Sequence, residues 1–314
     1  MRGKKDAKAN NHVHKISRRS YIKNNYQLYL MLILPLLYLL LFKYKPMLGA
    51  VAAFKKFNIF VGIMDSDWVG LAHFEEAFSS AAFWLSLKNT LVLNLGDIIL
   101  GFPVPIILAL FLYELNNKYI KKATQLILYL PNFLSWVIIA GIISQVCANN
   151  GLLNRTITAL GGTSIDFLTT PSIWRIVYWI TGIWQGAGYG LIIYLAALTG
   201  TDPNLSEAAY IDGAGRMKRI LFITIPQIKG TITVMLIMAL GKVISIGFER
   251  PFMMGNTLVK NASEVISTYV YSVGLQAGRF DFATAIGLFQ SVIGVILILV
   301  VNALAKKFGE EGII

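Results

Sequence analysis

Six long apolar segments dominate the sequence and limit the folds that are open to it. They cover residues 27–43, 88–113, 125–147, 173–199, 229–248 and 283–305. A helix that crosses a bilayer needs about 20 mainly apolar residues, which most of these segments supply. They predict an all-α polytopic membrane protein with six transmembrane helices.

The composition agrees with a membrane protein and excludes several other classes. The 314 residues are 56% hydrophobic and only 14% charged, with a mean hydropathy of +0.63. The single Cys147 excludes an internal disulfide, and three histidines without a cysteine or carboxylate cluster predict no metal site. The sequence contains no phosphate-binding loop of the G-x-x-x-x-G-K-[ST] type. If ATP drives this protein, another chain must bind it.

The distribution of Lys and Arg predicts the orientation. Of the 28 basic residues, 16 lie in the segments 1–26, 114–124, 200–228 and 306–314. Positive charge is retained on the cytoplasmic side, so we expect both termini and these loops there. The basic tail 1–26 is then a topology signal that contacts anionic lipid, and we expect no nucleic-acid partner. No small-residue cleavage pattern follows the first apolar segment, which predicts an uncleaved anchor.

The loop 200–228 contains a short predicted helix. Asp202 suits its N-cap, Pro203 its first turn and Gly213 its end, which predicts about three helical turns. A helix of this length is not stable alone. Its position between two apolar segments indicates a docking element for a soluble partner, with an ordinary helical hairpin as the alternative.

The residues of this helix resemble a known motif. Glu207-Ala208-Ala209, a glycine four residues later and Ile225-Pro226 beyond it resemble the EAA loop of ABC importer permeases. That resemblance implies coupling to a separate ATPase through the helix. The small alanines would let it enter a groove, and Glu207 would bond groups around it. The coupling residues implied are Glu207, Ala208, Ala209, Asp212 and Gly213.

Four further segments narrow the resemblance to the carbohydrate importer permeases, in the subgroup for oligosaccharides and polysaccharide fragments. They are Ser86–Thr90, Gly247–Phe252, Ser263–Tyr271 and Ala285–Ser291. The resemblance implies the type I importer fold in residues 27–305 and a place in the bacterial plasma (inner) membrane. It also implies a second homologous permease, two subunits that bind ATP and Mg, and an extracytoplasmic sugar-binding protein. No cofactor is expected on this chain, and the sugar and the identity of the second permease stay open.

Aromatic and amide side chains inside the spans are candidates for the substrate pathway. Aromatic faces can stack on a sugar while amides bond its hydroxyls, although helix packing is the alternative for each residue. Trp174, near a span end, is predicted to lie at the membrane interface. The pathway candidates are Trp179, Trp184, Gln185 and Tyr189, with Asn132, Glu249 and Gln290 as weaker ones.

Charged and small residues inside the spans raise further expectations. Asp97 is costly in lipid and should bond Lys242, another structural partner or the substrate. Gly182, Gly186 and Gly190 share one helix face, which permits close helix packing. An ion-coupled secondary transporter of a small polar solute is the alternative function. It would couple to ions through paired carboxylates near the bilayer centre or through discontinuous helices in repeated halves, whereas Asp97 is the only clear acid inside a span. The outer loops 44–87 and 249–282 predict a small lobe and either a receptor-contacting scoop or a cap over the bundle.

Overall fold

The computed structural model describes residues 24–307, and most of the predicted tails 1–26 and 306–314 therefore lie outside the described residues. The chain forms two compact units that divide after Val51. The first contains one long apolar helix that runs into the next unit, residues 26–54. It comprises α2 (Tyr26–Leu39), a π-helical turn (Leu40–Tyr44), α3 (Lys45–Met47) and a 3-10 segment (Leu48–Phe54).

The second predicted span is a helix of 33 residues, Ala81–Tyr113, which begins seven residues before the expected position. It comprises α6 (Ala81–Gly96), a π-helical turn (Asp97–Gly101) and α7 (Pro103–Tyr113). Ser80 caps its start by accepting a bond from the Phe83 amide at 3.4 Å. Pro103 lacks an amide hydrogen and its ring crowds the carbonyl four residues earlier, which explains the widened turn before it.

The third predicted span, 125–147, is wrong as a continuous helix. The segment Lys118–Phe133 meets Trp136–Val146 at 100°. Pro131 lies in the 3-10 turn Leu130–Phe133 that ends α8 (Lys118–Tyr129), and Ser135 caps the start of α9 (Trp136–Val146). A proline that cannot continue the helix and a serine that begins a new one together produce the bend.

The remaining spans follow the apolar pattern more closely, except at one end. α11 (Pro171–Thr199) and α19 (Phe280–Lys307) match the predicted helices 173–199 and 283–305. The fifth predicted span, 229–248, is wrong at its end because α15 (Lys229–Gly241) stops at Gly241. Residues 242–248 are not helical, and α16 (Glu249–Met254) follows them. Four helices are long and apolar enough to cross a membrane, or up to six if each bent pair is one span.

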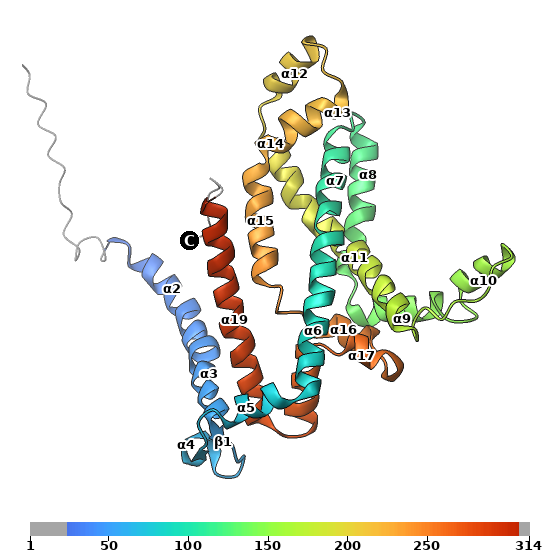
Figure 1. The fold of residues 1–314 in the computed structure, drawn as a ribbon. Helices are drawn as coiled ribbons and strands as arrows, with labels where there is room; N and C mark the ends of the chain where they lie inside the picture. The colour runs from blue at the N-terminus through green and yellow to red at the C-terminus, as the bar shows by residue number, and fades with distance from the viewer. Residues whose placement is uncertain (1–23, 308–314) are drawn as a thin grey trace, which may run out of the picture. The chain divides into compact units, whose positions relative to one another are not determined.

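In the second unit, the shorter elements lie at the two ends of the long helices and beside their middle (Figure 1). β1 and β2 form an antiparallel pair in which Lys55 faces Trp68 and Lys56 faces Asp67. The bounds of these elements are β1 (Lys55–Lys56), α4 (Gly62–Asp65), β2 (Asp67–Trp68), α5 (Ala72–Ser79), α10 (Leu152–Ala159), α12 (Pro203–Ile211), α13 (Arg216–Arg219), a π-helical turn (Ile220–Thr224), α14 (Ile225–Gln227), a 3-10 turn (Thr257–Val259), α17 (Lys260–Ser263), α18 (Ile266–Tyr271) and a π-helical turn (Ser272–Gln276).

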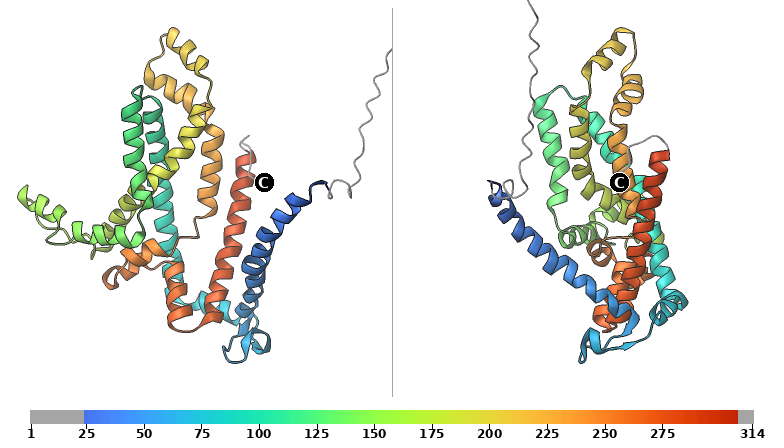
Figure 2. Two further views of the ribbon diagram at one scale, coloured as in Figure 1. Left: turned by 180° about the vertical axis from the view of Figure 1, so that it is seen from behind. Right: turned by 90° about the vertical axis from the view of Figure 1, so that its left-hand side faces the viewer.

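Helix α11 lies at the centre of the second unit and packs against α7 and α8 (Figures 1 and 2). Glycines permit this close approach: a Cβ on Gly188 would lie 2.1 Å from the Leu128 carbonyl oxygen, and one on Gly190 would lie 2.9 Å from Pro105. The predicted packing role of the glycine face is therefore confirmed at Gly190. Gly186 has no atom within 4 Å of a Cβ and instead lines a cavity.

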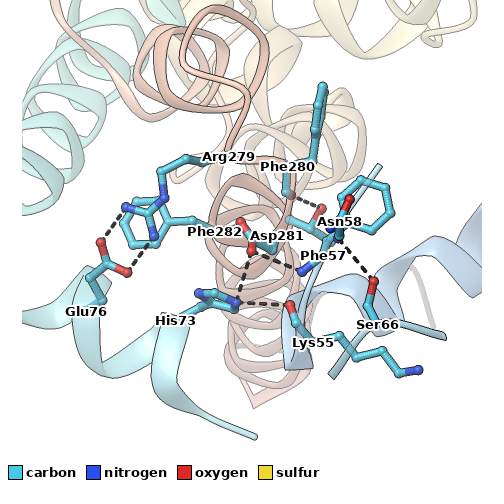
Figure 3. Close-up of polar contacts among 11 residues, drawn as sticks. Lys55, Phe57, Asn58, Ser66, His73, Glu76, Arg279, Phe280, Asp281 and Phe282 are labelled. Carbon is cyan, nitrogen blue, oxygen red and sulfur yellow. Dashed lines mark hydrogen bonds and ion pairs between the residues drawn. The ribbon is translucent and has the colours of Figure 1, made fainter. Parts of the chain in front are cut away.

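The expected small lobe consists of β1, β2, α4 and α5, and polar contacts fix it to the start of α19 (Figure 3). The Asp281 carboxylate accepts a bond from the Phe57 amide at 3.2 Å and lies 3.4 Å from His73 Nε2. Arg279 donates two bonds to the Glu76 carboxylate, at 2.5 and 2.6 Å. The bond from Arg279 lowers the pKa of Glu76, and the same bond raises the pKa of Arg279.

Candidate functional site

Helix α12, the predicted docking helix, has the caps that the sequence indicates. The Asp202 carboxylate accepts a bond from the Asn204 amide at 2.9 Å. At the other end Gly213 adopts φ +80°, and the Ala214 amide donates to the Ala209 carbonyl at 2.8 Å. This is the bond pattern of a glycine-terminated helix, in which a left-handed residue closes the last turn. The prediction of a short helix between Asp202 and Gly213 is confirmed.

Most of the surface of α12 is uncovered. None of its residues is buried, and Glu207, Ala208, Asp212 and Gly213 are exposed, whereas Ala209 is half-buried. Two large apolar side chains follow the motif, with Tyr210 68% and Ile211 84% exposed. An exposed apolar patch on a short, separately capped helix is the signature of an interaction site.

Polar contacts hold α12 and its neighbours to the ends of the long helices. The Gln227 side chain accepts a bond from the Asp202 amide at 2.9 Å. The Arg219 guanidinium lies 5.2 Å from the centre of the Tyr210 ring, a cation–π contact. Arg216 Nε lies 2.9 Å from a carboxylate oxygen of Glu114, which follows α7. These contacts join the start of α12 to α14, and α13 to the end of α7.

A second polar group of residues lies midway along the long helices. Asp97, the 17th of the 33 residues in the helix 81–113, pairs with Arg250 of α16. The two bonds from the guanidinium measure 2.7 and 3.1 Å. Arg250 also donates to the Tyr178 carbonyl of α11, so one side chain links three helices. The structural partner expected for Asp97 is thus Arg250, and the expected contact with Lys242 is wrong.

Aromatic and small residues complete the surroundings of Arg250. Its guanidinium lies 3.6 Å from the ring centre of Tyr178 and 5.3 Å from that of Trp136. A Cβ on Gly182 would lie 2.1 Å from an Arg250 nitrogen, so glycine is required to admit the side chain. A cavity of about 220 Å³ adjoins this ion pair, with Gly182 and Gly186 in its wall.

Two tryptophans of α11 are packing residues in this structure. Trp174 has no exposed surface and donates from its indole nitrogen to the Met254 carbonyl at 2.8 Å. Its prediction as an interface residue is wrong, because α16 and α17 cover this end of α11. Trp179 donates to the Leu93 carbonyl at 3.0 Å and fills the space that Gly96 leaves open. These are the contacts of a packing residue, the alternative given for Trp179.

The other pathway candidates divide by exposure. Trp184 is 45% exposed and Tyr189 62% exposed on α11, whereas Gln185 is half-buried. Glu249 is exposed at the first turn of α16, and Asn132 is half-buried in the bend between α8 and α9. Gln290 donates to the Ile244 carbonyl at 2.7 Å, so its amide bonds the backbone of the segment 242–248. The candidates therefore lie on several elements, namely α11, α16, α19 and the 3-10 turn that follows α8.

Arg250 is the main residue that the sequence reasoning placed incorrectly. It was assigned to the outer loop 249–282, since it follows the last apolar residues of the fifth segment. The structure places the start of that loop beside Asp97, at the middle of the helices. The useful signal in the sequence is the isolated acid itself. A carboxylate among apolar helices favours a cation as its partner, and an arginine directly after a helix break can reach back to it.

No group of three or more His, Cys, Asp or Glu side chains within residues 24–307 could hold a metal ion. Asp97, Arg250 and Gln290 instead bond one another or the backbone. The structure thus combines an uncovered helix at one end of the bundle with a partly buried polar joint at its middle.

Comparison with known proteins places this arrangement in a family. Residues 79–309 match the family model described as "Binding-protein-dependent transport system inner membrane component". The chain is 45% identical over 287 residues to the polygalacturonan/rhamnogalacturonan transport system permease protein YteP of Bacillus subtilis, covering 91% of this chain and 89% of that protein.

Two solved structures are also similar. One is a bacterial alginate ABC transporter in complex with an alginate pentasaccharide-bound periplasmic protein, with a TM-score of 0.86 and 37% identity over 93% of this chain and 98% of that chain. The other is a bacterial ABC transporter involved in the import of the acidic polysaccharide alginate, with a TM-score of 0.85 and 38% identity over 92% of this chain and 98% of that chain.

Proposed function

The chain belongs to the binding-protein-dependent transport system inner membrane components, and from this premise we propose that it is one permease subunit of an ATP-driven importer of oligosaccharides. Fragments of acidic polysaccharides are the proposed substrate class. Relatives named for polygalacturonan and for alginate support it, since both sugars are chains of uronic acids. The chain itself is a transport subunit, and hydrolysis of ATP with Mg belongs to separate subunits.

The observation that carries this proposal is the uncovered helix α12. It presents Glu207, Ala208 and the apolar residues Tyr210 and Ile211 without a partner in this chain. Two ATP-binding subunits would cover this helix and its counterpart on a second, homologous permease. The contact of Arg216 with Glu114 would carry the movement of α12 to α7. Both termini and the α12 loop are then cytoplasmic, in agreement with the positive charge of the segments that accompany them.

The proposed pathway lies between this chain and the second permease. Exposed aromatic residues on α11, Trp184 and Tyr189, would line it. Gln185, Asn132 and Glu249 would contribute polar groups, whereas Trp179 and Gln290 already bond the backbone of neighbouring elements. An extracytoplasmic sugar-binding protein would deliver the sugar to the end that carries the lobe of β1, β2, α4 and α5.

The test is sugar uptake and ATP hydrolysis in proteoliposomes that contain the complete importer. Glu207→Ala removes a carboxylate on the face of α12, and Gly213→Pro is incompatible with φ +80° because proline fixes φ near −65°. Both variants should lose uptake and the ATPase activity that the loaded binding protein stimulates. Insertion of the chain in the membrane should be unchanged, since both residues lie outside the spans.

Wild-type uptake and stimulation in both variants would exclude the coupling role of α12. A variant at the opposite end, Phe60→Ser, is the control for membrane insertion and for ATPase activity without the binding protein, because Phe60 is 96% exposed on the lobe. The same proteoliposomes distinguish an ion-coupled carrier from the proposed importer. Uptake by an ion-coupled carrier would persist without ATP and follow an ion gradient. Uptake by the proposed importer should stop when ATP is removed.

A further inference from the structure

The non-helical segment 242–248 carries a charged side chain at the middle of the transmembrane helices. Two hydrogen bonds to the backbone of this segment show its depth along the helices. Asn94 of α6 donates to the Val243 carbonyl at 2.7 Å, and Gln290 of α19 donates to the Ile244 carbonyl at 2.7 Å. The ion pair of Asp97 with Arg250 marks the same level immediately after the segment. Lys242, the C-cap residue of α15, begins this segment.

Lys242 differs from Arg250 in having no acidic partner. Its side chain is exposed, and none of the ion pairs formed within residues 24–307 includes it. Met238, one helical turn earlier, is 46% exposed and extends the same face of α15. An ammonium group at this depth is too costly to leave in lipid, so it must face water, a ligand or an acid of another subunit.

The backbone around Lys242 favours an aqueous surface. Irregular backbone at membrane depth is tolerated only inside protein or along a water-filled cavity, and broken helices recur at the binding sites of transporters. Ser245 and Gly247 are exposed, as is Glu249 at the start of α16. Buried Val243, Ile244 and Ile246 alternate with them and hold the segment against the core. One side of the break is thus apolar and packed, and the other is polar and open.

We propose that Lys242 binds a carboxylate of a uronic acid unit as the sugar passes through the permease, and that it makes the permease itself selective for acidic oligosaccharides. The ammonium supplies three donors to the carboxylate, a charge-assisted contact. Glu249 can accept hydrogen bonds from hydroxyl groups of the same oligosaccharide. Asp97 is paired with Arg250, which donates to both of its oxygens. This inference rests on the proposed function.

The experiment measures sugar binding to the purified, ATP-free importer without its binding protein, so that any preference belongs to the permeases. The two probes are a short oligogalacturonate and its carboxyl-reduced, neutral form. Wild-type importer should bind the acidic probe about tenfold more tightly, the ratio that one ion pair of about 1.4 kcal/mol produces, and added salt should weaken that preference. Lys242→Gln should bind both probes alike, whereas Lys242→Arg should keep the preference.

Lys260→Gln is the matched control, because Lys260 is paired with Glu264 on the outer loop at 3.3 Å. It should bind like the wild type. An unchanged preference in Lys242→Gln, or equal binding of both probes by the wild type, would overturn the inference. Loss of the second permease on purification of Lys242→Gln, but not of Lys242→Arg, would instead assign the lysine to an intersubunit ion pair and also overturn it.

Uptake with the binding protein separates this inference from the proposed function. A wild-type importer that takes up oligosaccharide without any preference at the permease supports the function and refutes the role of Lys242. A wild-type importer that takes up no oligosaccharide refutes both.

Discussion

The α12 segment and the Arg250 joint are both polar features of an apolar chain, yet they are built in opposite ways. Every residue of α12 is at least partly exposed, and a few surface contacts hold it. Arg250 is bonded to Asp97 and Tyr178 and covered by aromatic rings. A surface that awaits a partner leaves its side chains free, whereas a joint at membrane depth must satisfy every charge internally. We therefore expect changes in α12 to affect the binding of a partner, and changes at Arg250 to affect the stability of the fold.

The strongest test of this contrast is loss of the paired arginine. Arg250→Ala leaves Asp97 without its cation and should destabilise the chain by up to about 3 kcal/mol, the lower end of the cost of breaking a fully buried ion pair, because the pair is partly exposed. Thermal unfolding of the purified importer measures the effect. Asp97→Asn combined with Arg250→Ala should cost less than the sum of the two single changes, because no charge remains unpaired. Arg155→Ala, at an exposed arginine of α10, is the control and should unfold like the wild type.

Two tryptophans of one helix provide the next comparison. Trp179→Ala removes a ring that packs against Gly96 and donates to the Leu93 carbonyl, so it should cost about 3 kcal/mol. Trp184→Ala, at a side chain that is 45% exposed, should leave the unfolding temperature nearly unchanged but lower sugar uptake per assembled complex. Equal destabilisation by both changes would mean that Trp184 is also a packing residue.

A surface ion pair at the lobe gives a smaller, pH-dependent effect. Because Arg279 lowers the pKa of Glu76, the pair contributes stability above the ordinary carboxyl value of 4.5 and loses it as pH falls through the lower folded value. Glu76 is about half exposed, so solvent screening limits the contribution to at most about 1 kcal/mol. Unfolding curves from neutral to acid pH should therefore fall less steeply for Glu76→Gln. A parallel fall would show that the pair contributes nothing.

The smallest effect on stability is expected at the exposed helix. Ile211→Ser should change the free energy of unfolding by less than about 0.5 kcal/mol, since Ile211 is 84% exposed. It should nevertheless reduce the amount of ATPase that copurifies with the chain. Phe60→Ser on the lobe should leave copurification unchanged. If Ile211→Ser destabilises the chain as strongly as Arg250→Ala, α12 is part of the core and the contrast fails.

The sequence by itself determined the helical membrane class, the family resemblance and the caps of α12. These follow from local properties: apolar length decides what can span lipid, and Asp202 and Gly213 set a helix start and end through their own backbone and side-chain geometry. The helices 173–199 and 283–305 were predictable for the same reason, as both are uninterrupted apolar runs.

Only the tertiary structure decided where these runs bend and which charges meet. The apolar run of the third segment shows no interruption at Pro131, where the helix bends. The apolar run of the fifth segment continues through residues 242–248 although α15 ends at Gly241. The pairing of Asp97 with Arg250 spans 153 positions of sequence, and Trp174 is buried only because distant residues cover it. Such contacts depend on how helices pack, and no local pattern encodes a partner that is brought near only when the whole chain has folded.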